Sequence, residues 1–166
     1  MMPNDCLLSK EDDALVVGWS AVVQAVDVSH HAPLSARRAL HATVLIDQLS
    51  DLVFARRSML LEPLLATSGD FLTFRAGLRD REPALGLLMD MTACDVHGPS
   101  LQLVAAQVPP DDFGNLAVAE LMVSLYNVGT VPKLMLVKSD GKMLPMQDLL
   151  LQAANWWRAS LAHKLR

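Results

Sequence analysis

The spacing of apolar residues changes near Phe71, and this change limits the folds open to the chain. Before it, apolar residues recur at helical spacing, whereas after it short apolar runs alternate with turn residues. Apolar stripes at i, i+3, i+4 and i+7 indicate amphipathic helices, and short runs between turns are typical of strands. The sequence therefore predicts an α+β fold, with helices first and then a mostly antiparallel sheet of about five strands with helices packed on it.

Two helices are predicted before residue 57, over Ala14 to Val28 and from Ser35 onward. The stripe of the first is Val16, Trp19, Val23 and Val26. The stripe of the second is Leu40, Val44, Leu45, Leu49, Leu52 and Val53. We interpret residues 1–57 as a helical N-terminal extension and residues 58–166 as an α+β domain.

From residue 58 the predicted order is helix, three strands, helix, two strands, helix. The three strands are Phe71 to Phe74, Ala84 to Thr92 and Leu101 to Val108. The later pair is a hairpin of Lys133 to Lys138 and Lys142 to Leu144, whose turn carries the Asp-Gly pair typical of tight hairpins. The final helix runs from Asp148 to about His163, with Leu150, Ala153, Ala154, Trp157 and Leu161 on one face.

The predicted helix from about Phe113 to Tyr126 is apolar around most of its circumference. Glu120 is its only charged residue. A helix of this kind is stable in water only when it is covered on more than one side. This pattern indicates contact with a partner surface as well as with the chain's own core.

Charge and cysteine content exclude several classes of function. The net charge is −4, so the chain lacks the electrostatic basis for non-specific binding to nucleic acid or to an anionic membrane. The uncharged run Ala14 to Val26 has 13 residues, too few to span a bilayer. Cys6 and Cys94 have no metal-ligand spacing. We therefore expect a cytoplasmic protein without a metal or other cofactor, and with neither nucleic acid nor membrane as a partner.

Two clusters invite a chemical interpretation. Cys94, Asp95 and His97 fall in one loop and have the residue types of a nucleophile, an orienting carboxylate and a base, but no nucleophile-elbow or oxyanion-hole pattern surrounds them. His30 and His31 have no nearby residues to complete a metal site. Ordinary turn chemistry is the favoured interpretation of both, so we expect no enzyme activity; a small enzyme using the Cys94 loop is the alternative.

Four features of the second half together resemble one known family. They are an acidic turn, Pro109 to Asp112, leading into the apolar helix; the Lys138 to Lys142 hairpin; Leu144 to Met146 before the last helix; and Trp157-Arg158 near its end. Their order resembles that of the class I type III secretion chaperones, the family of the Tir chaperone. Small size and low pI agree with this resemblance.

The resemblance implies a homodimer that binds an unfolded segment of a secreted effector protein and needs no ATP. It implies a dimer interface on the apolar helix, formed here by Val118, Leu121, Met122 and Leu125. The client would lie extended over apolar patches, for which we expect Phe71, Phe74, Leu134 and Leu136. A regulatory protein-binding module, using the N-terminal helices to hold a transcription factor, is a further alternative.

Overall fold

The computed structural model describes residues 5–56, 69–93, 95, 97–108, 116, 120, 122–124 and 129–162, with side chains from residue 14 onward. Over these residues the chain has the predicted α+β composition. Its elements are α1 (Asp5–His30), α2 (Ala36–Ala55), α3 (Phe71–Arg81), α4 (Pro83–Thr92), β1 (Ser100–Gln107), β2 (Thr130–Val137), β3 (Met143–Pro145) and α6 (Met146–Leu161).

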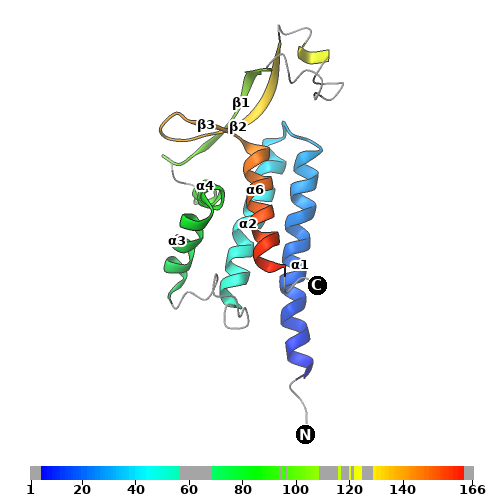
Figure 1. Cartoon of the computed structure of the whole chain (residues 1–166), viewed down its shortest axis with the longest axis vertical. Helices are drawn as coiled ribbons and strands as arrows, with labels where there is room; N and C mark the ends of the chain where they lie inside the picture. The colour runs from blue at the N-terminus through cyan, green and yellow to red at the C-terminus, as the bar shows by residue number, and fades with distance from the viewer. Residues whose placement is uncertain are drawn as a thin grey trace.

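Helices α1, α2 and α6 lie side by side, and the sheet caps one end of this bundle (Figure 1). Helices α3 and α4 flank the bundle on the side of α2 (Figure 1). Helix α2 begins after Ser35, whose hydroxyl accepts the Arg38 backbone N–H at 3.4 Å, as the sequence predicts.

The sheet is antiparallel throughout, in the order β1-β2-β3. Leu103 of β1 lies opposite Leu134 of β2. The predicted hairpin between β2 and β3 is confirmed. Gly141 has a φ of +80° in its turn, and the Asp140 carboxylate accepts the Lys142 backbone N–H at 3.0 Å. A left-handed conformation at this position explains the glycine.

Two predicted strands are wrong, and the first is Phe71 to Phe74. These residues form the first turn of α3, because the Asp70 carboxylate caps the helix by accepting the Thr73 backbone N–H at 2.8 Å. The turn residues that end at Asp70 are also typical of a segment that stops a helix, whereas Asp70 begins one here. An Asp before an apolar run is also an N-cap signal, and this role prevails here.

The second wrong prediction is the strand Ala84 to Thr92, which is helix α4. Pro83 occupies its first turn, and the Glu82 carboxylate caps it by accepting the Ala84 backbone N–H at 3.1 Å. Because this helix is buried on several sides, its apolar residues do not recur at helical spacing. Pro83, at a position where helices often begin, was the one helix signal in the segment. The described sheet consequently has three strands where we predicted about five.

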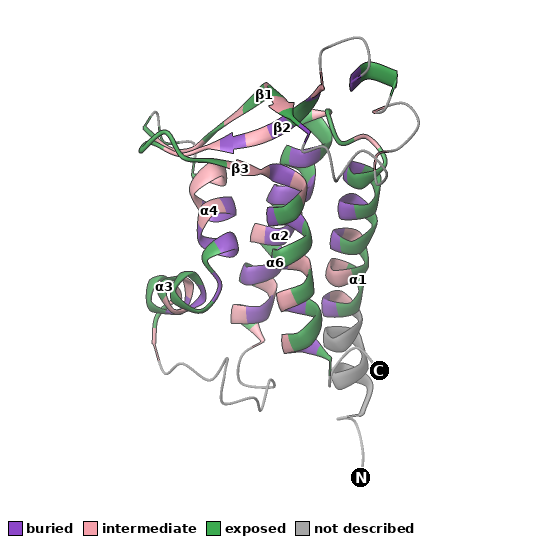
Figure 2. Ribbon diagram, turned by 45° about the horizontal axis from the view of Figure 1, so that its top comes forward, coloured by how far each residue is buried: buried purple, intermediate pink, exposed green. Residues whose placement is uncertain are grey.

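One hydrophobic core joins all the helices and the sheet (Figure 2). It contains Ile46 of α2, Leu85 of α4 and Trp157 of α6, each fully buried. Residues from both sides of the predicted boundary at 57/58 therefore share one interior. The predicted apolar face of the last helix is confirmed, whereas the stripe predicted for α1 is rotated, leaving Val16 and Val23 each 46% exposed.

Candidate polypeptide-binding edge

Strand β1 is the most exposed regular element of the sheet. Its sequence, SLQLVAAQ, contains no charged residue and no proline, and none of its residues is buried. Leu103 is 62% exposed although its opposite neighbour, Leu134, is 4% exposed. Edge strands of soluble proteins normally carry charges, prolines or bulges that block pairing with other chains. Strand β1 has none of these protections.

One edge of β1 pairs with β2, and the described structure places no strand on its other edge. The Val108 backbone N–H, just beyond β1, donates to Gly129 O at 2.9 Å. The backbone N–H and C=O groups of successive residues in an antiparallel strand point alternately to its two edges. Because the groups of Val108 face β2, those of every second residue before it face β2 as well. The backbone groups of Leu101, Leu103 and Ala105 therefore point to the open edge.

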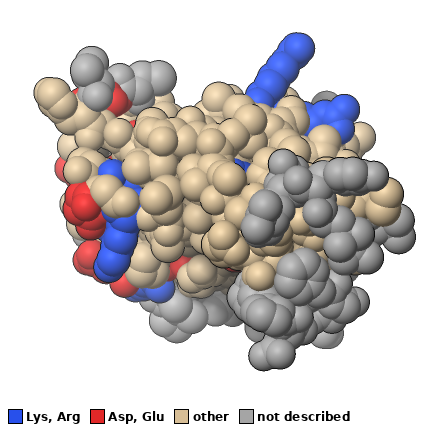
Figure 3. Space-filling view, turned by 90° about the horizontal axis from the view of Figure 1, so that it is seen from above, with Lys and Arg blue, Asp and Glu red and all other residues tan. Residues whose placement is uncertain are grey.

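The face of the sheet turned away from the helices is apolar only in part, because the register also places Gln102 and Lys133 on it, opposite Met135 and Val104. Val104 and Met135 share this face with Val137 and with Met143, which is 51% exposed. Seen from above, the middle of the molecule shows few charged side chains, and Lys, Arg, Asp and Glu gather toward its edges (Figure 3). An extended chain paired with β1 would lie along the border of this face.

The predicted client-binding residues lie mainly in the core. Phe74 is 2% exposed, Leu134 4% and Leu136 fully buried. Phe71 is partly buried against the ring of Phe54, with 5.1 Å between the ring centroids. Helix α3 holds both phenylalanines, whereas β2 holds both leucines, so the structure does not bring the four together as one surface patch.

The predicted dimer interface is described at one position only. Met122 is 49% exposed and lies in a helical segment, as expected for a residue at an interface. Val118, Leu121 and Leu125 lie outside the described residues. The homodimer through these four residues therefore stays a prediction.

The two clusters for which ordinary turn chemistry is the favoured interpretation make the following contacts in the described residues. Cys94 lies outside them, and the Asp95 carboxylate accepts the His97 backbone N–H at 3.0 Å, a typical turn contact. The His31 ring lies 3.5 Å from the Asp27 carboxylate, both groups being well exposed. In the described part of the chain, no group of three or more His, Cys, Asp or Glu side chains is placed to hold a metal ion.

A partly buried charge cluster has a structural role between helices. The Arg75 guanidinium of α3 lies 2.7 Å from the Asp47 carboxylate of α2, which also accepts a hydrogen bond from the Thr92 hydroxyl of α4 at 2.6 Å. Partial burial, together with the neighbouring Asp47 charge, raises the pKa of Asp51 above its usual value, while Arg75 opposes this. The cluster joins three helices.

Within the described residues, no helix is both long enough and apolar enough to cross a membrane. Comparison of the chain with protein-family models, with curated proteins and with solved structures gave no match.

Proposed function

We propose that this protein binds an unfolded polypeptide by adding an extended segment of it to the open edge of β1. The observation that carries the proposal is the uncharged edge of an eight-residue strand, beside which the described structure places no further strand. In strand addition, backbone hydrogen bonds supply affinity and alternate side chains supply selectivity. The exposed Leu103 side chain is available to contact those side chains.

The identity of the client is the part of the proposal that rests on the family resemblance. We propose that the protein is a cytoplasmic homodimeric chaperone, and that its client is an N-terminal segment of a secreted effector protein. Backbone pairing suits this role, because it holds a segment extended while depending little on its sequence. Binding alone keeps such a client unfolded, so the function requires neither ATP nor a metal.

Residue-resolved amide hydrogen exchange tests the binding edge directly. The probe is a reduced and alkylated protein that cannot refold. In the free protein, we expect slow exchange at Gln102 and Val104, whose amides face β2, and fast exchange at Leu101, Leu103 and Ala105. Addition of the probe should slow exchange at the second group. If the probe is bound at saturation and the exchange rates of these three amides do not change, the binding site lies elsewhere.

A substitution in β1, compared with a control substitution elsewhere, tests whether the strand contributes to affinity for the probe. Leu103→Lys adds a charge of the kind that blocks edge pairing, and we expect it to weaken probe binding by about tenfold or more. Leu72→Lys is the control, because Leu72 is a 75% exposed leucine on α3, away from the sheet. Equal affinities of the two variants for the probe would contradict the proposal.

A further inference from the structure

The residues whose backbone groups face the open edge of β1 form a symmetric set. The bond from the Val108 N–H to Gly129 O fixes which residues face β2, and the residues between them face the open edge. The members of this open set are Leu101, Leu103, Ala105 and Gln107. Because they are evenly spaced, the open set maps onto itself when a second copy of the strand runs antiparallel beside it about a two-fold axis at Val104.

A two-fold axis at Val104 gives every member of the open set a partner. In this register Leu101 lies opposite Gln107 of the copy, and Leu103 lies opposite Ala105 of the copy. Two residues that face each other in this way exchange both of their N–H···O bonds. An axis at Leu103 or at Ala105 would leave one member of the open set without a counterpart. The register about Val104 therefore satisfies the most backbone groups.

The side chains of β1 also suit a copy of the same strand. Leu103 is 62% exposed and is the one large apolar side chain of β1 that is left open. In the register about Val104, the two copies of Leu103 are diagonal neighbours, about 7–8 Å apart and within reach of long side chains. Self-pairing therefore covers the apolar side chain that the fold leaves exposed.

Charge does not oppose self-pairing at this edge. Strand β1 has no charged residue, so two copies of it place no like charges opposite each other. Lys133 of β2 is the one charged residue in the three strands. Three strand spacings, about 14 Å, would separate it from its own copy. This distance exceeds the Debye length of about 8 Å at physiological salt, so the repulsion is screened.

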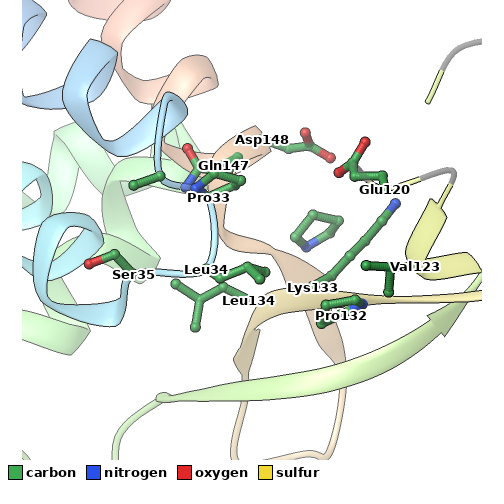
Figure 4. Close-up of a pocket in the computed structure, with 12 residues that line it drawn as sticks. Pro33, Leu34, Ser35, Glu120, Val123, Pro132, Lys133, Leu134, Gln147 and Asp148 are labelled. Carbon is green, nitrogen blue, oxygen red and sulfur yellow. The ribbon is translucent and has the colours of Figure 1, made fainter. Parts of the chain in front are cut away.

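The opposite side of the sheet offers no equivalent edge in the described structure. Strand β3 forms that side, but it has three residues and ends in Pro145. The part of β2 that β3 leaves uncovered contains Pro132, which has no N–H to donate. The turn between α1 and α2, with Pro33 and Leu34, lies beside this part of β2 across a cavity (Figure 4). Only β1 combines length with an edge free of proline.

We propose that a second copy of this protein occupies the open edge of β1 when no client is bound. The two sheets then join across the two-fold axis into one antiparallel sheet of six strands, three from each copy. A single strand pair buries little surface, so this dimer is weak and a client segment can displace it. The pairing involves other residues than the interface predicted around Met122. Competition with a client rests on the proposed function, whereas the pairing itself does not.

Engineered cysteines test the position of the axis, in the full chain with Cys6→Ser and Cys94→Ser. Val104 would face its own copy as a non-hydrogen-bonded pair, with Cα atoms about 4.5 Å apart, which a disulfide can bridge. Val104→Cys should therefore form a covalent dimer on mild oxidation. Gln102→Cys is the control, because it lies on the same face but about 13 Å from its own copy. We expect its yield of covalent dimer to be at least about tenfold lower.

A mixture of two variants supplies the positive control. Gln102→Cys mixed with Ala106→Cys should give a covalent heterodimer, because these positions face each other in the register about Val104. Non-reducing gel electrophoresis measures all the yields. Equal yields of covalent dimer from Val104→Cys and from Gln102→Cys alone would overturn the proposal.

Amide exchange in the parent protein tests the pairing without any substitution. When the protein concentration rises from about 5 µM to about 500 µM, exchange at the four residues of the open set should slow by mass action. Exchange at Gln102 and Val104, whose amides face β2, should be slow at both concentrations. Exchange at the open set that does not change with concentration would contradict a weak dimer through β1.

The covalent Val104→Cys dimer separates this inference from the proposed function. If both are correct, the oxidised dimer does not bind the reduced and alkylated probe, and dithiothreitol restores binding. A dimer that cross-links selectively at Val104 and still binds the probe would leave self-pairing standing and remove β1 as the client's edge. Exchange in β1 that the probe slows, without selective cross-linking, would leave the proposed function standing and remove this inference.

Discussion

The helical body and the sheet of this protein differ sharply in how they treat apolar residues. In the helical body Trp157 of α6 is fully buried among α2, α4 and α6, whereas in the sheet Leu103 of β1 is 62% exposed. Strand β2 pairs with the backbone groups on one edge of β1, and the described structure places no strand on the other edge. The comparison teaches that apolar side chains are packed together in the helical body, whereas β1 leaves a large one, Leu103, at the surface.

The largest expected effect comes from removing residues 1–57. This truncation removes Val22, Ile46, Leu49 and Val53, all of which lie within the shared core. Because those residues cover the faces of α4 and α6, we expect the remaining chain to show no cooperative thermal unfolding by circular dichroism. Val17→Lys, at a 66% exposed position of α1, should leave unfolding cooperative. A cooperative transition in residues 58–166 would show that the predicted boundary divides two independent domains.

A single substitution in each region sharpens the same contrast. Trp157→Ala should lower the free energy of unfolding by about 3–5 kcal/mol, because it leaves a large cavity at the centre of the helical body. Leu103→Lys in the sheet should change it by no more than about 0.5 kcal/mol. Chemical denaturation monitored by circular dichroism measures both. Similar losses for the two variants would show that β1 contributes to the core.

The smallest effect concerns acid stability at the start of α3. Hydrogen bonds from the Thr73 backbone N–H and hydroxyl lower the pKa of Asp70 below 3.8 in the folded state. This carboxylate therefore stabilises the fold above pH 3.8, and the contribution is lost as the pH falls through the lower, folded-state pKa. Asp70→Ser keeps a capping oxygen that does not titrate. As the pH is lowered, the melting temperature of the variant should fall less steeply than that of the parent protein. If the two melting temperatures fall in parallel, the Asp70 carboxylate is not a source of the acid sensitivity.

The elements that sequence analysis predicted correctly are those with a one-sided pattern. Helix α6 buries Leu150, Ala153 and Trp157 on one face, so its period was visible. Helix α4 was missed because it is buried on several sides, and α3 was missed because Asp70 resembled a stop signal. Local sequence carries no information about which sides of an element the rest of the fold covers.

The candidate sites were harder to predict than the fold. Strand β1 was predicted as a strand, but its open edge follows from the order of strands in the sheet, which is a tertiary property. The absence of charge in its sequence was the one available signal. A cavity of about 520 Å³ beside β2 is lined by Leu34, Glu120 and Asp148, which lie far apart in the chain. Leu134 was predicted to belong to an exposed client-binding patch, but it is 4% exposed.

The different spacing of the two strand pairs has a consequence for the order of folding. Strands β2 and β3 meet across a short turn, whereas β1 reaches β2 only after the whole segment between Gln107 and Thr130 has been brought together. Closing a longer loop costs more chain entropy, and non-local pairing is slow. Strand β1 should therefore dock last. A newly made chain thus passes through a stage in which neither edge of β1 is paired with another strand. Pairing of one edge with β2 follows later.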